Sequence, residues 1–500
     1  MEGAYPERSP RYPRPTSLPH HRSSVEGFQL TLKLALPKGW LQPDTAVLLE
    51  RAGFALEGYD ASSRSYRPVS RAFPDLFIKI FHEKDIAIQV AIGNYDLAVC
   101  GFDWFQELRV KYHTHTLVKI RDLGYGKRDL YAATAKGSPI HSLSDLKAKE
   151  GPVRIVSEYP NLAEAFAFRL RLRNFRVMPL WGAPEAYPPE HADIALVTAT
   201  SPKEMDEKGL VPLAQILSGH AWLIANRDSM ERKDLSRVLG PFHGIEPERA
   251  LSDELSIAEM GQSVEIGPPH PDEQTVMLAL PDGHQQVHVQ AFLRKIGLEI
   301  RGYESSPPSR RPALGMKGVS AKVIRPQDMP TQVANGNFDL AITGRDWLRD
   351  QLYQFPSSPV KELVDFGFGR VRIVAVVHND FPAARISDLH AMLHSGRIPV
   401  LRIAAEYTNI ADQFARVHHL SPYKVIPTWG ATEAFLPEDA DVLIENTETG
   451  RTLAKHNLRI IETLFESSGC LIGNSQSLED PLKKDRIQQL VEMFRKGLGA

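Results

Sequence analysis

The sequence predicts an α/β fold in which one unit occurs twice in tandem, and three observations support this prediction. Long motifs of the first half return in the second half of the 500-residue chain in the same order. Within each half, short apolar runs typical of strands alternate with segments of helical periodicity. Apolar residues make up 42% and charged residues 24% of the chain, which is ordinary for a globular protein with a sizeable core.

The internal repeat extends over both halves. Five pairs of segments carry it: "LKLALPKGW" (32–40) with "VMLALPDGH" (276–284), "DLAVCGFDW" (96–104) with "DLAITGRDW" (339–347), "DLGYGKRDLYAA" (122–133) with "DFGFGRVRIVAV" (365–376), "SEYPNLAEAFA" (157–167) with "AEYTNIADQFA" (405–415), and "PLWGAPEAYPPEHADIAL" (179–196) with "PTWGATEAFLPEDADVLI" (427–444). In the last pair Trp181 matches Trp429 at an offset of 248 residues. A tandem duplication explains this order, and the length of the unit excludes a short-repeat solenoid.

The repeat sets the predicted domain boundaries. Residues 1–26 are rich in Pro, Ser and Arg without an apolar run, so we expect a disordered tail and not a secretory signal. Residues 27–240 form the first copy and residues 273–500 the second. The stretch 241–272 is dominated by Pro, Gly and acidic residues, which predicts a linker that holds at most one short helix.

The elements of the first copy illustrate the alternation. Four β-rich runs end in Gly, Pro or charged residues: "LTLKLALP", "DLAVCG", "LYAATA" and "VRIVSE". Two segments have helical spacing, "DTAVLLERAGF" and "NLAEAFAFRLR". The alternation predicts a largely parallel sheet with ligands beyond the carboxyl ends of its strands. After Leu471 one helical segment remains, "DPLKKDRIQQLVEMFRKGL".

Composition excludes several classes of function. The net charge is −2, so a broad basic footprint for nucleic acid is absent. No apolar run approaches the roughly 18 residues of a membrane-spanning helix, so we expect no membrane partner. Two cysteines, Cys100 and Cys470, suit a reducing cytoplasm and are interpreted as buried small hydrophobes.

The stretch "ENTETGRT" (445–452) follows a predicted strand and has the chemistry of an anion site. Thr447, Thr449 and Thr452 offer hydroxyl donors, and Gly450 lets the backbone approach an oxyanion closely. Glu445 can accept hydrogen bonds from a sugar diol, so the pattern suits a ribose 5-phosphate. The alternative is a plain helix N-terminus capped by Thr449.

Five motifs in order, "LALPKG", "DLAITGRDWL", "DFGFGRVRIVAV", "AAEYTNIADQFA" and "DVLIENTETGRTLAKHNL", resemble the catalytic chain of ATP phosphoribosyltransferases. The resemblance implies two tandem type II periplasmic-binding-protein-like units, each with two α/β lobes and a cleft. It also implies a reaction, the first step of histidine biosynthesis, that joins ATP to 5-phosphoribosyl 1-pyrophosphate and releases pyrophosphate. Mg²⁺ would be carried mainly by the pyrophosphate, so we expect no dedicated protein metal site.

The resemblance also implies site residues. The catalytic candidates are Glu445, Arg370 and Lys38. The phosphoribosyl pyrophosphate candidates are Glu445, Asn446, Thr447, Glu448, Thr449, Gly450, Arg451 and Thr452. The nucleotide candidates are Arg345, Asp346, Gly367, Gly369, Arg370, Glu406, Tyr407 and Asn409. For Arg345 and Arg370 a surface ion pair is the alternative, and Trp181 and Trp429 are interpreted as packing residues.

The two halves depart from the family pattern at different places. In the first half Val197 replaces the sugar carboxylate, and Pro202, which has no N–H, replaces Gly450. In the second half Asp282 stands where the first half keeps Lys38. One hypothesis is therefore a fused dimer, in which the first half lends Lys38, Arg64 or Arg67 to the site of the second.

The other hypotheses are a non-catalytic nucleotide- or phosphoribosyl-binding regulatory paralogue and transfer to another acceptor base. The short C-terminal segment resembles the family's short form, so we expect either a separate regulatory subunit or a homo-oligomer, in the cytoplasm. The sequence leaves open the activity, feedback by histidine and the oligomeric state.

Overall fold

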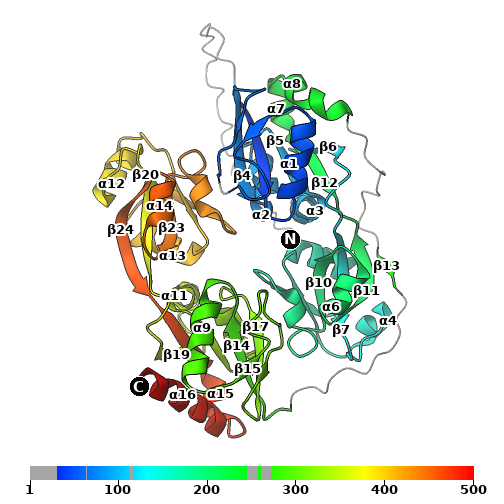
Figure 1. Ribbon diagram of the computed structural model, residues 1–500, viewed down its shortest axis with the longest axis vertical. Helices are drawn as coiled ribbons and strands as arrows, with labels where there is room; N and C mark the ends of the chain where they lie inside the picture. The colour runs from blue at the N-terminus through cyan, green and yellow to red at the C-terminus, as the bar shows by residue number, and fades with distance from the viewer. Residues whose placement is uncertain (1–30, 64, 113–115, 245–256, 261–271, 500) are drawn as a thin grey trace, which may run out of the picture. The chain divides into compact units, whose positions relative to one another are not determined.

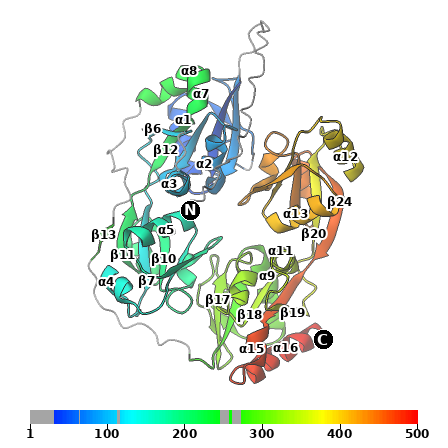
Figure 2. The same ribbon diagram turned by 180° about the vertical axis from the view of Figure 1, so that it is seen from behind.

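The computed structural model describes residues 31–63, 65–112, 116–244, 257–260 and 272–499. The predicted tail and Arg64 therefore lie outside the described residues, and so does most of the predicted linker. By their contacts, residues 32–500 form one unit. Four sheets of five or six strands, two two-stranded sheets and flanking helices make up the described part of this unit (Figures 1 and 2).

The first lobe of the first half is a five-stranded sheet. Its strands, in spatial order, are β4 (Leu76–His82), β1 (Leu32–Lys38), β5 (Leu97–Gly101), β12 (Ala221–Asn226) and β6 (Leu117–Asp122). Its helices are α1 (Gln42–Arg51), α2 (Glu83–Ala91), α3 (Phe102–Lys111), α7 (Arg227–Arg232) and α8 (Ser236–Leu239), and β2 (Leu56–Glu57) pairs with β3 (Val69–Ser70). β1 is apolar and mostly buried because helices cover the sheet.

The second lobe of the first half contains six strands. They are, in order, β13 (Ala258–Glu259), β11 (Leu210–Leu217), β7 (Asp129–Ala135), β10 (Ile194–Ala199), β8 (Val153–Ser157) and β9 (Phe175–Pro179). Its helices are α4 (Leu143–Ala148), α5 (Pro160–Arg169), η1 (Pro184–Ala186) and α6 (Pro202–Glu207), and η2 (Gly240–Gly244) follows the half. The predicted linker thus supplies one edge strand, β13, to this sheet.

The second half repeats both lobes. Its first sheet has the order β17 (Val319–Ile324), β14 (Val276–Pro281), β18 (Leu340–Gly344), β25 (Gly469–Asn474) and β19 (Val360–Asp365). Its helices are α9 (His284–Lys295), α10 (Met329–Ala334), α11 (Arg345–Gln354), α15 (Ser475–Glu479) and α16 (Lys484–Leu498), and β15 (Ile300–Arg301) pairs with β16 (Ala313–Leu314). The predicted last helix is α16, which buries Ile487, Leu490 and Phe494.

The fourth sheet completes the duplication. Its order is β22 (Tyr423–Pro427), β21 (Leu401–Ala405), β23 (Val442–Thr447), β20 (Val371–His378) and β24 (Leu458–Ser467). Its helices are α12 (Ile386–His394), α13 (Thr408–Val417), η3 (Thr432–Phe435) and α14 (Arg451–Lys455). The strand orders match lobe for lobe, so the predicted tandem two-lobe units are confirmed.

The sheets are mixed, whereas the sequence pattern favoured largely parallel ones. β12 is antiparallel to β5 and β6, and β7 is antiparallel to β10 and β11. The chain crosses between the lobes twice, after β6 and after β11, and the returning strand β12 enters between two strands of the first lobe. Local periodicity in the sequence does not predict where the returning strand inserts into the sheet.

The two halves share buried contacts. Phe81 packs edge-on against Phe435 with ring centroids 5.3 Å apart, and one apolar core combines Met178 and Tyr187 with Ile324. The matched residues Trp181 and Trp429 meet each other, with ring centroids 6.3 Å apart. Contact between equivalent residues marks a pseudo-two-fold relation, as at an isologous dimer interface. The prediction that these tryptophans pack is consistent with this contact.

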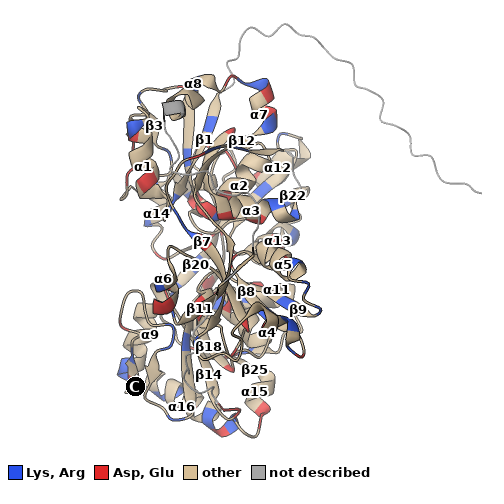
Figure 3. Cartoon of the chain, turned by 90° about the vertical axis from the view of Figure 1, so that its right-hand side faces the viewer, with Lys and Arg blue, Asp and Glu red and all other residues tan. Residues whose placement is uncertain are grey.

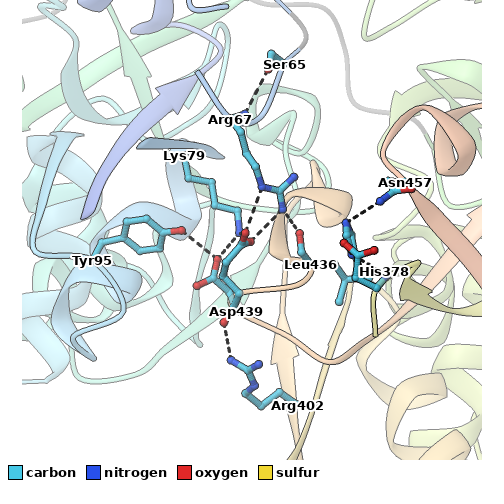
Figure 4. A network of polar contacts seen from close by, with 11 residues as sticks. Ser65, Arg67, Lys79, Tyr95, His378, Arg402, Leu436, Asp439 and Asn457 are labelled. Carbon is cyan, nitrogen blue, oxygen red and sulfur yellow. Dashed lines mark hydrogen bonds and ion pairs between the residues drawn. The ribbon is translucent and has the colours of Figure 1, made fainter. Parts of the chain in front are cut away.

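A charged network crosses the same boundary (Figure 4). The ammonium of Lys79, fully buried, lies 2.8 Å from Glu438 and 2.7 Å from Asp439. Arg67 also binds Glu438, at 3.0 Å. Burial raises the pKa of Glu438, but the hydrogen bonds and charges of Arg67 and Lys79 outweigh it and lower that pKa to about 2. Arg67 therefore serves this interface.

The pseudo-symmetric counterpart of this network joins Lys322 to Glu190 at 2.7 Å. Here burial dominates and lowers the pKa of Lys322 to about 7, despite the nearby carboxylate. Arg311 binds the same Glu190 at 2.6 Å. In both networks a buried lysine of one half binds a glutamate of the other half.

Charges and thiols agree with the composition. Figure 3 shows basic and acidic residues interspersed over the elements of the chain. Cys100 and Cys470 are buried and free, as predicted, and burial raises the pKa of both thiols. None of the helices within the described ranges combines the length and apolar character that a bilayer crossing requires.

Candidate functional site

The stretch 445–452 forms a turn between β23 and the five-residue helix α14. Gly450 adopts the left-handed conformation, with φ +75°, and its N–H donates to Thr447 Oγ1 at 3.0 Å. A side chain added at Gly450 would meet nothing within 4 Å, so the turn faces open space. Thr449 Oγ1 accepts a hydrogen bond from the Arg451 N–H at 3.5 Å, which resembles the capping alternative in part. Glu448, Thr449 and Thr452 are exposed.

Three carboxyl groups gather beside this turn: Glu406, Glu433 and Glu445. Burial and then the charges of Glu433 and Glu406 raise the pKa of Glu445 well above its usual value, while the Asn446 N–H at 2.9 Å opposes the shift. Burial and Glu433 likewise raise the pKa of Glu406 to about 7. Like charges at close range disfavour joint ionisation, so at neutral pH this cluster holds protons that isolated glutamates would lose.

The first half handles the matching position differently. Glu158, the counterpart of Glu406, binds the ammonium of Lys84 at 2.7 Å. In the second half Gln327 occupies the position of Lys84, and it offers Glu406 a side-chain hydrogen bond but no positive charge. Burial and Glu433 therefore raise the pKa of Glu406 without an adjacent lysine of its own half to oppose them.

Replacing Glu445 by glutamine is expected to stabilise the fold above neutral pH. A carboxyl with a raised pKa in the folded state favours folding below its unfolded pKa of about 4.3, and this benefit is lost as pH rises through the folded pKa. At pH 8 the glutamine variant should therefore gain on the order of 1 kcal/mol in unfolding free energy, with no gain near pH 4. Thermal melts across this range measure the effect.

The exposed Glu448→Gln variant is the control, because it removes a carboxyl from the same turn without touching the cluster. An equal pH-dependent gain in both variants, or none in Glu445→Gln, would contradict the assigned repulsion.

Tyr407 connects the turn to the other lobe of the second half. Its hydroxyl donates to buried Asp346 at 2.9 Å and accepts from Asn446 Nδ2 at 3.2 Å. Its ring stacks on Trp347 with centroids 4.2 Å apart. Burial raises the pKa of Asp346. Asp346 and Tyr407, both predicted as nucleotide residues, therefore act here as supports that orient Asn446.

Two other nucleotide candidates, Arg345 and Arg370, bond to groups outside the carboxyl cluster. Arg345 binds Glu362 and, at 2.9 Å, Asp365, which corresponds to the ion-pair alternative. Arg370 is exposed and donates from Nε to the Gly367 carbonyl at 3.1 Å, within the turn where Gly367 and Gly369 have positive φ.

Asn409 is engaged between helices. Its Nδ2 donates to Asp350 at 2.7 Å, and its backbone N–H donates to the same carboxylate at 3.0 Å. Asn409 therefore joins α13 to α11.

The first half supplies polar groups to the second-half turn. Lys38 Nζ donates to the Tyr66 hydroxyl at 3.1 Å and lies 4.8 Å from the centre of that ring. The Tyr66 ring in turn packs on His456, just after α14, with centroids 4.9 Å apart. Burial and then the charges of Glu433 and Glu445 raise the pKa of Tyr66. Lys38, Tyr66 and the carboxyl cluster therefore share one neighbourhood, although two halves of the chain contribute.

His82 is a second contribution of the first half. A Cβ at Gly430, whose φ is +106°, would lie 3.8 Å from both His82 Cδ2 and Glu406 Oε1. Burial, followed by Lys84 and Lys38, lowers the pKa of His82 to about 4. His82 is therefore neutral at physiological pH and can exchange hydrogen bonds without adding charge.

Sequence reasoning missed Tyr66, His82, Gln327 and Glu433 as site residues. Glu433 was visible as a residue kept in both copies, and Gln327 as a lost lysine in the aligned repeat. Nothing in the sequence marked Tyr66 or His82, because their role depends on which lobes meet. Within the described ranges no group of three or more His, Cys, Asp and Glu side chains has a metal-binding arrangement.

Comparison with known proteins bears on the origin of this site. The profile of the family described as ATP phosphoribosyltransferase matches twice, over residues 82–243 and 325–496. Proteins named ATP phosphoribosyltransferase are similar: that of Chlorobium luteolum is 32% identical over 206 residues, with 40% of this chain and 65% of its own length aligned. That of Geotalea uraniireducens is 32% identical over 212 residues, with 41% and 65% aligned.

The chain thus spans just under two thirds of the length of these relatives. A solved structure, the ATP phosphoribosyl transferase (HisG:HisZ) complex from Thermotoga maritima, aligns with 21% identity and a TM-score of 0.36 over 45% of this chain and 99% of that chain. The two profile matches coincide with the two structural copies and together cover most of the sequence. The chain therefore belongs to the ATP phosphoribosyltransferase family, as a tandem duplication of its catalytic unit.

Proposed function

We propose that this protein is a transferase that condenses ATP with 5-phosphoribosyl 1-pyrophosphate to give phosphoribosyl-ATP and pyrophosphate, the first step of histidine biosynthesis. The observation that supports it best is the second-half turn, where Glu445 and the open Gly450 segment adjoin Lys38 of the first half. The free and buried cysteines fit the expected cytoplasmic location.

In this proposal each part of the phosphorylated sugar has its own partner. The 5-phosphate would lie against the amides and hydroxyls of 447–452, because Gly450 leaves that approach open. The ribose diol would donate to Glu445. The pyrophosphate carries negative charge toward the side of Lys38, which is the cation that the second half lacks because it has Asp282 instead.

The chemistry requires alignment and charge stabilisation more than covalent participation. As pyrophosphate leaves, positive charge grows on the sugar carbon and negative charge on the leaving group. Lys38 would stabilise the departing anion, and the carboxyl group of Glu445 would lie beside the cationic sugar. Holding the adenine nitrogen in line with the sugar carbon supplies the rest of the acceleration.

Mg²⁺ would enter this site bound to the pyrophosphate. The carboxylate oxygens of Glu433 and Glu445 are hard ligands of the kind Mg²⁺ prefers. When bound, the ion would neutralise charge on the leaving pyrophosphate.

The pseudo-dimer also bears on partners. The first half stands, inside one chain, where a second subunit would complete the second-half site, so we infer that one chain is sufficient for that site. The Thermotoga maritima complex contains a second protein beside the transferase. A separate regulatory subunit, or a homo-oligomer, remains our expectation for regulation of this chain.

One observation favours a second candidate, a non-catalytic nucleotide- or phosphoribosyl-binding paralogue. Arg345 is neutralised by Glu362 and Asp365, so it is not free to meet a nucleotide phosphate. An absorbance assay for phosphoribosyl-ATP formation from both substrates with Mg²⁺ separates the two candidates. Adduct formation supports the enzyme, and binding of phosphoribosyl pyrophosphate without adduct supports the paralogue.

Gln327→Lys is expected to move the acid limb of the pH profile of kcat/KM to lower pH by about one unit. The new lysine restores the charge that Lys84 gives Glu158, so it favours ionised Glu406 and lowers its pKa from about 7. Steady-state rates across pH 5.5 to about 9 measure the shift, and comparing variants at each pH cancels titration of the substrate phosphates. Gln327→Met, which adds no charge, is the control; an identical limb in the lysine variant would rule out Glu406 as its source.

A further inference from the structure

A cavity of about 630 Å³ lies between the second lobe of the first half and the first lobe of the second half. Residues from these two lobes line it, among them Arg128, Tyr159, Val197, Thr198, Arg310 and Arg325. Its volume lies in the range of small-molecule sites. Val197 stands here in place of the carboxylate that would bind the sugar, and Pro202 lacks the N–H that Gly450 has in the phosphate turn. The ligand assigned to the second half therefore does not suit this cavity.

The acidic residues on the cavity wall are neutralised by cations. Glu185, the counterpart of Glu433, binds Arg310 at 2.7 Å. Glu158, the counterpart of Glu406, binds Lys84 at 2.7 Å. The two clefts therefore differ in electrostatic character, because the carboxyl groups that repel one another in the second half are each paired in the first.

Arg128 is a cation on the wall whose charge partly offsets the burial that raises the pKa of Glu83 and Asp103. It is half-buried, and its guanidinium carbon lies 5.5 Å from the centre of the Trp40 ring. Trp40 itself is 51% exposed, which is unusual for a tryptophan. At the matched position the second half has Val371, so Arg128 is not inherited from the shared unit.

Arg325 is a second incompletely neutralised cation on the wall. It stands where the other cleft has neutral His82, and its side chain is 43% exposed. It contacts Asp282 at 3.3 Å, but Arg310 holds the same carboxylate more closely, at 2.9 Å. Gly182 leaves it room, since a Cβ there would lie 2.8 Å from Arg325 Nε.

We propose that this cavity is a second binding site, which takes a diphosphate or triphosphate group through Arg128 and Arg325. Guanidinium groups bind phosphate oxygens in bidentate geometry, and a compact polyanion is the ligand class that two such groups on one wall select. The exposed Trp40 ring beside Arg128 offers a stacking face, so the group can belong to a nucleotide or to a free inorganic polyphosphate. The site does not depend on turnover in the second half.

The test uses the full chain with Gly450→Pro, which removes the second-half turn, titrated calorimetrically with inorganic tripolyphosphate without Mg²⁺. We expect one equivalent to bind, and Arg128→Gln and Arg325→Gln each to weaken binding at least about tenfold. Lys127→Gln, an exposed neighbour, is the charge-matched control and should bind as before. Circular dichroism checks that each variant is folded, and Arg128→Lys should restore part of the affinity.

Tryptophan fluorescence localises the ligand. Binding should change the emission of the parent chain, and Trp40→Phe should remove most of that change while binding persists. ATP that binds more tightly than tripolyphosphate identifies a nucleotide site, and equal affinities identify an inorganic one. Loss of all binding in Gly450→Pro, or equal affinities in Arg128→Gln and Lys127→Gln, would overturn the proposal whether or not the second half proves to be an active transferase.

Discussion

Replacing Gly450 by proline is expected to weaken binding of 5-phosphoribosyl 1-pyrophosphate by at least about 100-fold, or about 3 kcal/mol. Proline fixes φ near −65°, whereas Gly450 has φ +75°, so the turn must be rebuilt. The substitution also removes the N–H that donates to Thr447 at 3.0 Å, and with it the geometry of the amides that would hold the 5-phosphate. Isothermal titration with the ligand and Mg²⁺ measures the loss.

The repeat provides a matched control for this variant. Pro202→Gly makes the converse change at the corresponding position of the first half, at the start of α6. That variant should leave the stoichiometry and affinity of the second-half site unchanged. Undiminished affinity in Gly450→Pro would show that the turn does not bind the ligand. A loss of affinity in Pro202→Gly would show that the ligand binds in the first half and not in the second.

Lys38→Ala is expected to lower kcat/KM for phosphoribosyl pyrophosphate by about 10- to 100-fold. This loss corresponds to about 1.4 to 2.7 kcal/mol of transition-state stabilisation. Lys38 is the cation that the first half brings to the neighbourhood of Glu433 and Glu445, through Tyr66. Without it the departing pyrophosphate faces the carboxyl cluster with less compensation. The absorbance assay under steady-state conditions gives both constants.

Two further variants make this result specific to charge. Lys38→Arg keeps a positive charge at the end of β1 and should recover a substantial part of the rate. Lys38→Met keeps the apolar stem and should not. A full rate in Lys38→Ala would show that the first half is dispensable for the chemistry of the second.

The fold was largely predictable because duplication doubles the signal. Each motif pair located the same strand or turn in both copies, and "DVLIENTETG" placed a strand end and a glycine turn where β23 and Gly450 lie. The mixed direction of the sheets was not predictable, since it depends on where β12 and β25 insert after the chain returns from the other lobe. The position at which a strand inserts depends on the tertiary structure, which local periodicity does not predict.

The site was predictable only in part, for a related physical reason. Glu445 and Lys38 were found from the sequence, but the residues between them were not, because Tyr66 and His82 reach the second-half turn only through the pseudo-two-fold contact. Arg345 shows the opposite case: its position after a glycine suggested a ligand, while Glu362 and Asp365, both in β19, bind it. Long-range charge pairing decides such assignments.

The most direct test is a crystal of the full chain soaked with 5-phosphoribosyl 1-pyrophosphate and Mg²⁺. The composite-site hypothesis predicts one sugar phosphate per chain, with its 5-phosphate against residues 447–452, its diol at Glu445 and its pyrophosphate on the side of Lys38. Density for the ligand only between the lobes of the first half, or in neither half, would contradict it.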